Sequence, residues 1–404
     1  MLRDQFLLDP GLIFLNHGSF GACPVPVLQA LQHWQRETER NPVALLGRRS
    51  ADLLRQARDA LAAALGADTD DLVFMPNATT GVNTVARSLA LTAGDEVLTT
   101  DHEYGACDAA WRFICDRVGA HYRRIEIPLP YEPETWAQRL LDAVTPRTRL
   151  IFASHITSTT ALIFPVQDLC SRARDRGIAT LIDGAHAPGQ IDLDLQAVAA
   201  DYYTGNCHKW LCGPKGTAFL HVRQEHQRHI DATVLSWGYV DGTAGHSGFD
   251  AYLGHTGLER RLQWQGTRDL APFLAVPSAL AFQRANNWSA VRQACHDQAV
   301  SLLHRCCARS GLSPIAPDAA HGQMVPIPVQ ATDPEGLRQW LFEQHRIEVP
   351  VTTHGGQVFV RVSVQGYNTS VDLEALFEAL GSAGVCNDGG AGARGCRLTG
   401  SCGS

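Results

Sequence analysis

Residues 203–210, Tyr-Thr-Gly-Asn-Cys-His-Lys-Trp, hold one of only two lysines in a chain of 404 residues. Lysine and arginine together number 34, so the solvated faces of this protein are built with arginine. Unlike arginine, lysine can lose its proton and act as an amine nucleophile, for example to form a Schiff base. Lys209 is therefore a candidate catalytic residue, although the lysine count alone would also fit an ordinary basic residue in a loop.

The size and composition of the chain indicate a globular enzyme with two structural units. A length of 404 residues exceeds one typical core, and 45% hydrophobic with 19% charged residues suits a globular fold. The net charge of −7 disfavours nucleic acid or an anionic membrane as a partner, since phosphate contacts need clustered basic residues. No apolar run approaches the roughly 20 residues of a membrane span, and Leu12–Leu15 is too short for a signal peptide. We therefore expect a cytoplasmic protein.

The cysteines and histidines do not predict a metal site. Twelve cysteines contain no CxxC pair, and those of the Gly-rich C-terminal segment match no zinc spacing. A cytosolic chain of this size needs no disulfides, so most cysteines are expected to be small buried hydrophobes. His226 and His229 could chelate a metal in principle, but a polar helix face explains them more simply. We expect no metal ion.

Short apolar runs of strand type alternate with helical segments from residue 72 to residue 222. The runs cover residues 72–75, 96–99, 122–127, 150–153, 179–182, 202–204 and 217–222. This alternation predicts an α/β fold with a mostly parallel seven-stranded sheet that helices cover on both faces. After residue 286 helices mix with antiparallel strands, which predicts a smaller α+β domain.

We expect four parts along the chain. Residues 1–24 form an N-terminal segment associated with the small domain and the active-site lip, and residues 25–285 form the large domain. Residues 286–385 form the small C-terminal domain, and residues 386–404 a flexible tail rich in glycine. Within the large domain, the Gly- and His-rich segment Gly238–Gly257 is expected to be an active-site or interface loop.

Five consecutive strand ends carry polar or ionisable residues, at the edge where parallel sheets bind their ligands. They are residues 76–81, 100–105, 154–160, 183–186 and the lysine stretch. The first opens a helix, so its free N–H groups could bind an anion, although an ordinary N-cap looks the same. A single polar strand end is common, but five together are hard to explain by packing.

A lysine amine, an aspartate on a neighbouring strand end and a helix N-terminus for phosphate suit pyridoxal 5'-phosphate. Lys209 would form the internal aldimine, and Asp183 would keep the pyridine nitrogen protonated, so that the ring accepts electrons from the substrate Cα. An aromatic residue at a strand end could stack on the ring. Thr79, Asn206 and His208 are placed to donate hydrogen bonds to the phosphate.

Four motifs carry a resemblance to a known family. They are Phe-Met-Pro-Asn-Ala-Thr-Thr (74–80), Asp-His-Glu-Tyr-Gly-Ala (101–106), Asp-Gly-Ala-His-Ala-Pro-Gly (183–189) and Gly-Asn-Cys-His-Lys-Trp (205–210). Together they resemble the class V aminotransferase family of fold-type I pyridoxal phosphate enzymes, which implies that cofactor and a large and a small domain. Leu-Asn-His-Gly-Ser-Phe-Gly (15–21) resembles the isopenicillin N epimerase-like branch. The likeness runs from about residue 6 to residue 382.

The resemblance implies a role for each matching residue. Lys209 and Asp183 keep the roles given above, while His186 and Ser158 lie near the phenolic oxygen of the cofactor. Tyr104 stacks on the ring, with His102 as the less favoured candidate. The full cofactor-binding set that the resemblance implies is Lys209, Asp183, His186, Ala78, Thr79, Tyr104, Ser158, Asn206, His208 and Thr267.

Three further expectations concern the partner subunit and the substrate. Thr267 resembles the residue that reaches the cofactor phosphate of the partner subunit, which implies a homodimer. Arg361 matches the arginine that binds the α-carboxylate of the substrate, and a bidentate contact explains that residue type. A surface strand residue is the alternative for Arg361. Asn16, His17 and Ser19 suit the lip of a substrate pocket, or a plain connecting turn, and Asn16 and His17 are the candidate substrate ligands among them.

The cofactor leaves the reaction open among epimerisation at Cα, β-elimination with C–S cleavage, transamination and desulfuration. Overall likeness ranks the epimerase first and the C–S lyase second, followed by the aminotransferase. An epimerase needs a second acid opposite Lys209, for which Tyr104 and His17 are the candidates. No cysteine occurs between Cys307 and Cys386, which argues against desulfuration through a cysteine of the small domain. A binding protein without turnover would have lost Lys209 or Asp183.

Overall fold

The computed structural model describes residues 2–239 and 254–386. Most of the predicted loop Gly238–Gly257 lies outside the described residues, and so does the predicted tail apart from Cys386.

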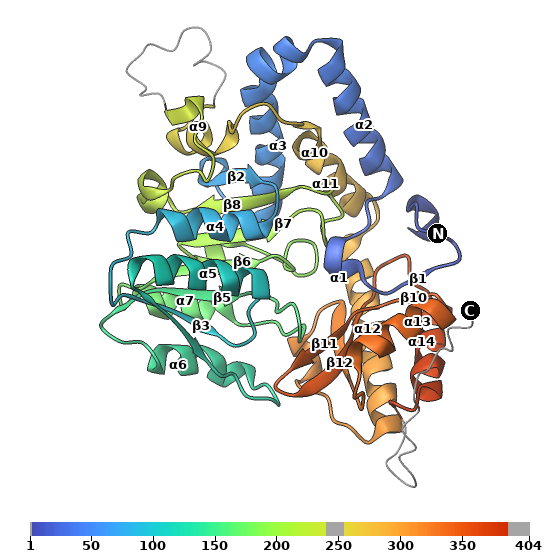
Figure 1. Ribbon diagram of the computed structural model, residues 1–404. Helices are drawn as coiled ribbons and strands as arrows, with labels where there is room; N and C mark the ends of the chain where they lie inside the picture. Colours follow the sequence, from blue (N-terminus) through green and yellow to red (C-terminus); the bar gives the residue numbers. More distant parts are fainter. Residues whose placement is uncertain (1, 240–253, 387–404) are drawn as a thin grey trace, which may run out of the picture.

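A seven-stranded sheet forms the centre of the larger part of the molecule (Figure 1). Its strands are β2 (Leu72–Met75), β3 (Glu96–Thr100), β4 (His121–Ile125), β5 (Thr148–Ser154), β6 (Ala179–Gly184), β7 (Tyr202–Asn206) and β8 (Ala218–Val222). The strand order is β2-β8-β7-β6-β5-β3-β4, and only the pairings of β8 with its two neighbours are antiparallel. All seven predicted runs form strands, so the predicted α/β fold class is confirmed.

Helices cover both faces of this sheet. They are α3 (Ser50–Leu65), α4 (Ala78–Ser88), α5 (Gly105–Val118), α6 (Pro133–Asp142), α7 (Val166–Arg174), α8 (Leu195–Val198), α9 (Gly257–Gln263), α10 (Ala271–Leu274) and α11 (Val276–Ala285). Along β2, Leu72 and Phe74 join the apolar cluster of α3, α6 and α7, whereas Val73 and Met75 join that of α4, α5 and α9. A strand buried on both faces has a continuous apolar sequence for this reason.

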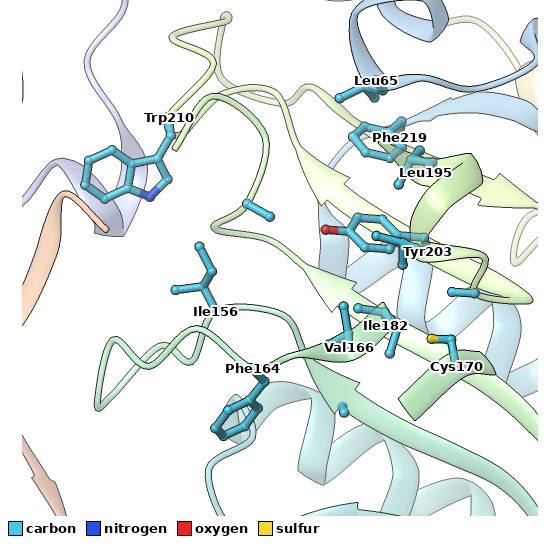
Figure 2. Close-up of a cluster of buried hydrophobic side chains, with 14 of the residues drawn as sticks. Leu65, Ile156, Phe164, Val166, Cys170, Ile182, Leu195, Tyr203, Trp210 and Phe219 are labelled. Carbon is cyan, nitrogen blue, oxygen red and sulfur yellow. The ribbon is translucent and has the colours of Figure 1, made fainter. Parts of the chain in front are cut away.

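Close packing beneath β7 supports the segment that leads to Lys209 (Figure 2). The rings of Tyr203 on β7 and Phe219 on β8 lie parallel, with centroids 6.2 Å apart, and both side chains are fully buried. The Tyr203 hydroxyl bonds Nδ1 of His155 at 2.8 Å. At Gly184 on β6 a Cβ atom would overlap the Tyr203 ring, so glycine is needed there for the two strands to pack.

The smaller part of the molecule contains a three-stranded antiparallel sheet in the order β11-β12-β9. Its strands are β9 (Met324–Val329), β11 (Val351–His354) and β12 (Gln357–Ser363), packed with helices α12 (Trp288–Ser310), α13 (Pro334–His345) and α14 (Ser370–Ser382). The N-terminal strand β1 (Ile13–Phe14) pairs in parallel with β10 (Ile347–Glu348). Helices α1 (His17–Phe20) and α2 (Val25–Arg40) and the π-helix η2 (Val43–Arg49) then lead to α3.

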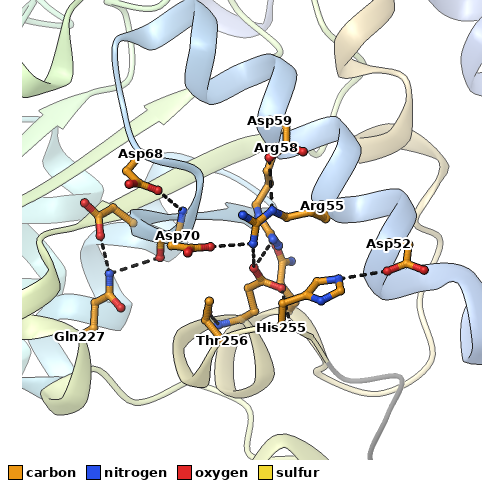
Figure 3. Close-up of polar contacts among 12 residues, drawn as sticks. Asp52, Arg55, Arg58, Asp59, Asp68, Asp70, Gln227, His255 and Thr256 are labelled. Atoms are coloured by element: carbon orange, nitrogen blue, oxygen red, sulfur yellow. Dashed lines mark hydrogen bonds and ion pairs between the residues drawn. The ribbon is translucent and has the colours of Figure 1, made fainter.

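A network of ion pairs fixes the edge of the large sheet against α3 and α9 (Figure 3). Arg58 on α3 is fully buried and pairs with the buried Glu259 of α9, while Arg55 binds Asp70 at 2.6 Å. Gln263 accepts hydrogen bonds from Arg58 Nη1 (3.2 Å) and from the backbone N–H of Phe74 (3.0 Å). The network therefore holds β2, whose end opens into the turn before α4.

Within the described residues, no helix combines the length and the apolar character needed to cross a lipid bilayer. The proposed domain boundaries and the cytoplasmic location stay predictions.

We predict that Gly81→Ala destabilises the protein, whereas Gly105→Ala does not. A Cβ atom at Gly81 of α4 would lie 2.2 Å from the Thr204 hydroxyl oxygen on β7, but at Gly105 nothing lies within 4 Å. Overpacking at a buried contact costs about 1–3 kcal/mol. Thermal unfolding of both variants would measure the difference, and equal melting temperatures would contradict the close contact of α4 with β7.

Candidate active site

A cavity of about 500 Å³ opens where β5, β6 and β7 end and α4 begins. Each of these strands contributes a polar side chain to its wall, namely Ser154, Asp183 and Asn206. The complete lining is Ser19, Phe20, Pro76, Asn77, Ala78, Thr79, Tyr104, Ser154, Ile156, Ser158, Asp183, Ala185, His186, Asn206, His208, Lys209, Lys215 and Gly216. The cavity therefore lies at the predicted edge of the sheet and collects side chains from five strand ends.

The turn that carries Lys209 is held rigidly by its backbone. The N–H groups of Cys207 and His208 both donate to the carbonyl of Thr217, at 3.0 and 3.2 Å. The carbonyl of Trp210 accepts a hydrogen bond from the buried Gln283 at 2.9 Å. Gly21, with φ +70°, lies so close to the His208 carbonyl that a Cβ atom would fall 2.0 Å from it. The N-terminal segment thus packs directly on this turn.

The lysine amine contacts an imidazole whose tautomer is fixed. Trp210 Nε1 donates to His186 Nδ1 at 3.3 Å, so the proton of the neutral imidazole sits on Nε2. His186 Nε2 lies 3.2 Å from Lys209 Nζ and can donate to it only if the amine is neutral. Burial, with the charge of Arg361 as a second cause, lowers the pKa of Lys209 to about 7. The fixed tautomer of His186 and the lowered pKa of Lys209 both favour a neutral amine, which can act as a nucleophile or base.

Asp183 lies buried on the cavity wall and accepts two hydrogen bonds from the protein. Oδ1 accepts the N–H of Ala185 at 2.9 Å, and Oδ2 contacts the thiol of Cys107 at 3.6 Å. Burial raises the pKa of Asp183, partly offset by its hydrogen bonds and by Lys209. Nearby, burial raises the pKa of Glu103 to about 8, although Ser154 and Thr100 donate to it. The Cys107 contact could not be predicted from the sequence, because this residue begins the apolar face of α5.

Four of the predicted phosphate-binding residues meet at the start of α4. Ala78, Thr79, Asn206 and His208 all line the cavity. Asn206 Oδ1 accepts the N–H of Ala78 at 2.9 Å, which fixes the end of β7 against the helix N-terminus. His208 Nδ1 donates to the Thr217 carbonyl at 2.9 Å, and burial lowers the pKa of His208 to about 4.

Lys215 also lines the cavity, and the sequence analysis did not select it. The scarcity of lysine could have pointed to it, but its position five residues beyond the lysine stretch matches no motif.

The residues that line the cavity fit pyridoxal 5'-phosphate: an amine, a buried carboxylate and a helix N-terminus with polar side chains surround one cavity of suitable size. Lys209, Asp183 and the residues at the start of α4 would hold the cofactor.

The structure brings Tyr104, and not His102, to the cavity. The Tyr104 side chain lines the cavity and is 48% exposed. His102 is buried and bonds Thr160 Oγ1 (2.8 Å) and the Ile127 carbonyl (3.2 Å) through its two nitrogens. Stacking of Tyr104 on the cofactor stays a prediction.

Arg361 is 5% exposed and lies behind the cavity wall. Its Nη1 donates to the carbonyl (2.5 Å) and hydroxyl (3.3 Å) of Ser158, and its Nη2 to the hydroxyl of Ser19 at 3.0 Å. Nε is buried without a hydrogen-bond partner. Burial lowers the pKa of Arg361 to about 10. The alternative of a surface strand residue is wrong, because the guanidinium is buried between two residues of the cavity wall.

His17 does not reach the cavity, which corrects its expected role as a substrate ligand or second acid. Its Nε2 donates to the Lys209 carbonyl at 3.0 Å, and its Nδ1 accepts from the Tyr367 hydroxyl at 3.0 Å. The ring is fully buried beside Trp210, and burial lowers its pKa to about 3. A neutral imidazole with both nitrogens engaged positions the lysine turn but has no proton to deliver to a substrate.

Some neighbours of His17 in the N-terminal turn line the cavity, and one lies outside the lining and contacts Arg361. Asn16 lies outside the lining and contacts Arg361 Nη2 at 3.5 Å through Oδ1. Ser19, which the sequence suggested for the lip of a pocket, forms part of the wall, and so does Phe20, which was not selected from the sequence. Thr267 is exposed and outside the lining, so its expected contact with a partner subunit stays a prediction.

Comparison with known proteins agrees with this geometry. Residues 13–376 match the family described as Aminotransferase class-V. The chain belongs to this family. It is 38% identical over 387 residues to an isopenicillin N epimerase of Amycolatopsis lactamdurans, covering 94% of this chain and 96% of the relative. The resemblance to the isopenicillin N epimerase-like branch is thereby confirmed.

More distant relatives include other members of the family. The chain is 27% identical over 420 residues to a probable chloroplastic L-cysteine desulfhydrase of Arabidopsis thaliana, covering 94% of this chain and 84% of the relative. Among solved structures, a C-DES mutant with glycine covalently linked to its pyridoxal phosphate superposes with a TM-score of 0.80 at 22% identity. The match covers 94% of this chain and 98% of C-DES. This class V protein is therefore a pyridoxal 5'-phosphate-dependent enzyme of fold-type I.

We predict that borohydride fixes the cofactor on Lys209 of the purified enzyme, and that apoenzyme takes up cofactor in a pH-dependent way. Because the pKa of Lys209 is lowered to about 7, its amine is neutral above that pH, and the uptake rate should reach its plateau near pH 8. An unperturbed lysine would give a rate that still rises towards pH 10.

Absorbance of the bound cofactor would follow the uptake, and peptide mass spectrometry would locate the reduced adduct. Lys209→Ala is the control and should give no adduct. An adduct on Lys215, or a rate that keeps rising above pH 9, would contradict the assignment.

Proposed function

We propose that this enzyme epimerises or racemises an amino acid, or an amino-acid-like substrate, at its Cα atom. The observation that carries the proposal is the poised Lys209 amine, in contact with His186 Nε2 at 3.2 Å, in the same cavity as the phenol of Tyr104. Two proton-transferring groups in one cavity are what inversion at carbon requires.

The bound cofactor would act as an electron sink for the Cα–H bond. Asp183 would hold the proton of the pyridine nitrogen, since Oδ2 otherwise contacts only the weakly donating thiol of Cys107. Lys209 would remove the Cα proton, with His186 keeping its amine oriented. Arg361 would bind the substrate carboxylate, partly through its unpartnered Nε, while Ser19 and Ser158 hold its two other nitrogens.

Tyr104 is the proposed second acid because His186, His208 and Asp183 have other contacts, and Lys215, which also lines the cavity, is the alternative. His186 bonds Lys209 and therefore belongs to the same side as the base. His208 donates to the Thr217 carbonyl at the start of α4, in the region proposed for phosphate. Asp183 is committed to the ring nitrogen in this proposal. Tyr104 is half-exposed within the cavity and remains for the proton delivered to the opposite face.

Two relatives support different reactions. The similarity to isopenicillin N epimerases, at 38% identity, favours epimerisation. C–S lysis is the second candidate, because relatives at 27% identity are named L-cysteine desulfhydrases and C-DES is a cystine C–S lyase. Transamination ranks third. Desulfuration through a nucleophilic cysteine of the small domain is not favoured, since no cysteine occurs between Cys307 and Cys386.

We also propose a homodimer, in which Thr267 reaches the cofactor phosphate of the other subunit, and a cytoplasmic location. Exposure of Thr267 outside the cavity of its own chain is compatible with the first proposal. The homodimer rests on the family resemblance.

We predict that Tyr104→Phe abolishes inversion but preserves exchange of the Cα proton. Isopenicillin N and a panel of amino acids would be incubated in D2O and followed by NMR and chiral chromatography. The wild-type enzyme should incorporate deuterium and give both stereoisomers without a keto acid. Without the phenol, inversion should fall by about 10²-fold or more, while Lys209 still exchanges the proton on its own face.

The matched control is Tyr131→Phe, whose hydroxyl contacts the Ile163 carbonyl outside the cavity and should not matter. If the enzyme releases pyruvate and a thiol from cysteine conjugates and forms no second stereoisomer, the reaction is C–S lysis and not epimerisation. Absence of Cα exchange for every substrate would refute both.

We predict that Arg361→Leu lowers kcat/KM by roughly ten- to several-hundred-fold, because a charge-assisted contact to the substrate carboxylate is lost. Arg338→Leu, which removes a solvent-exposed partner of Glu335, is the control and should leave kcat/KM unchanged. An unaltered kcat/KM for Arg361→Leu with all accepted substrates would remove this residue from the site.

A further inference from the structure

Two histidines and an aspartate meet where the hairpin of the small sheet touches the large domain. His354 ends β11 at the tip of the β11–β12 hairpin, and Asp101 and His102 directly follow β3. The two imidazole rings lie nearly face to face, with centroids 3.8 Å apart and planes at 31°. Asp101 Oδ1 is 3.8 Å from His102 Nε2, and Asp101 Oδ2 is 3.6 Å from His354 Nε2.

We propose that Asp101, His102 and His354 form a binding site for a divalent transition-metal ion of the Zn²⁺ type, which clamps the hairpin onto the large domain. One ligand atom of each residue lies within 4.8 Å of the others. Two imidazoles and one carboxylate are ligands that Zn²⁺ prefers, and three protein ligands leave the fourth position for water.

The surroundings of His102 already provide the support that a metal-bound imidazole needs. Its Nδ1 lies 2.8 Å from the hydroxyl of Thr160, which in turn lies 2.8 Å from that of Thr157. Thr157 accepts the N–H of Leu162 and can accept a second proton from Thr160. Thr160 can then accept a proton from Nδ1, which leaves the Nε2 lone pair for the ion. The ion replaces one neutral hydrogen bond, from Nε2 to the Ile127 carbonyl at 3.2 Å.

The other two ligands are held and accessible. The N–H of Ile127 binds Asp101 Oδ1 at 2.9 Å, which fixes the carboxylate and leaves Oδ2 towards His354. The side chains of Asp101 and His354 are 25% and 12% exposed, so an ion can enter from solvent, while that of His102 is fully buried. Sequence analysis predicted no metal, because His354 stands far from the other two residues in the chain.

A second group of potential ligands among the described residues, Asp201, Glu225 and His226, has less suitable chemistry. It contains a single imidazole, and Glu225 is 53% exposed and paired with Arg223 at 2.8 Å. Asp201 also accepts the N–H of Thr180 at 2.7 Å. A cation adjacent to one carboxylate ligand opposes a metal ion, so this group serves as a comparison in the test.

An ion in the first group would act on the active site through the backbone. His102 is two residues before Tyr104, which lines the cavity, and the hairpin already contacts the large domain through Thr352 Oγ1 and the Thr159 carbonyl at 3.0 Å. Coordination would add a strong link between the same two elements. This inference does not depend on which reaction the enzyme catalyses.

The test uses the full-length holoenzyme, treated with EDTA and desalted, and then titrated with ZnCl₂. Calorimetry and metal analysis would count the bound ions, and thermal unfolding would follow stability. The wild type should bind one more Zn²⁺ per chain than His354→Ala or Asp101→Asn. Zn²⁺ should raise its Tm by about 2–4 °C and leave the Tm of both variants unchanged.

Two variants serve as controls. His304→Ala removes an exposed histidine paired with Asp318, and His226→Ala disables the second group of ligands. Both should bind Zn²⁺ as the wild type does. Equal Zn²⁺ binding by wild type, His354→Ala and Asp101→Asn would overturn the proposal, since cysteines or other residues would then hold the ion. Loss of the ion in His226→Ala alone would overturn it as well.

Discussion

The contact between Lys209 and His186 is the interaction on which the rest of the site depends. An amine can be a nucleophile near neutral pH only if its surroundings disfavour the ammonium form. Burial and the nearby Arg361 do this, and the Trp210 indole fixes the imidazole in the tautomer that donates to a neutral amine. The sheet, the N-terminal segment and the small domain all contribute to holding this one turn in place.

Three segments remote from one another in the chain converge on Arg361. The guanidinium comes from β12 of the small domain, Ser158 from the large domain and Ser19 from the N-terminal turn. A buried charge needs several hydrogen-bond acceptors, and here the acceptors also form the cavity wall. The contacts that join the two domains therefore also fix the position of the arginine behind the cavity wall.

The sequence predicted the large sheet well because each strand, buried on both faces, has a continuous apolar run. It did not predict β10 or β11. Strand β10 has only two residues, and β11 has the mixed sequence Val-Thr-Thr-His. Among site residues, Lys209 and Asp183 were found through residue type and motif. His17 was assigned wrongly because a turn sequence does not determine which way a side chain points. Phe20, Lys215 and Cys107 were missed because only folding brings them to the site.

The pairing of β1 with β10 has a consequence for how the protein is made. Residues 13–14 are synthesised long before their partners at 347–348. The large sheet can form during translation, since its strands follow one another in the chain. The N-terminal strand can pair only after residues 347–348 have been synthesised. The contacts of Gly21 and His17 with the lysine turn therefore also form late. The lysine turn therefore gains its full support only after the small sheet has been synthesised.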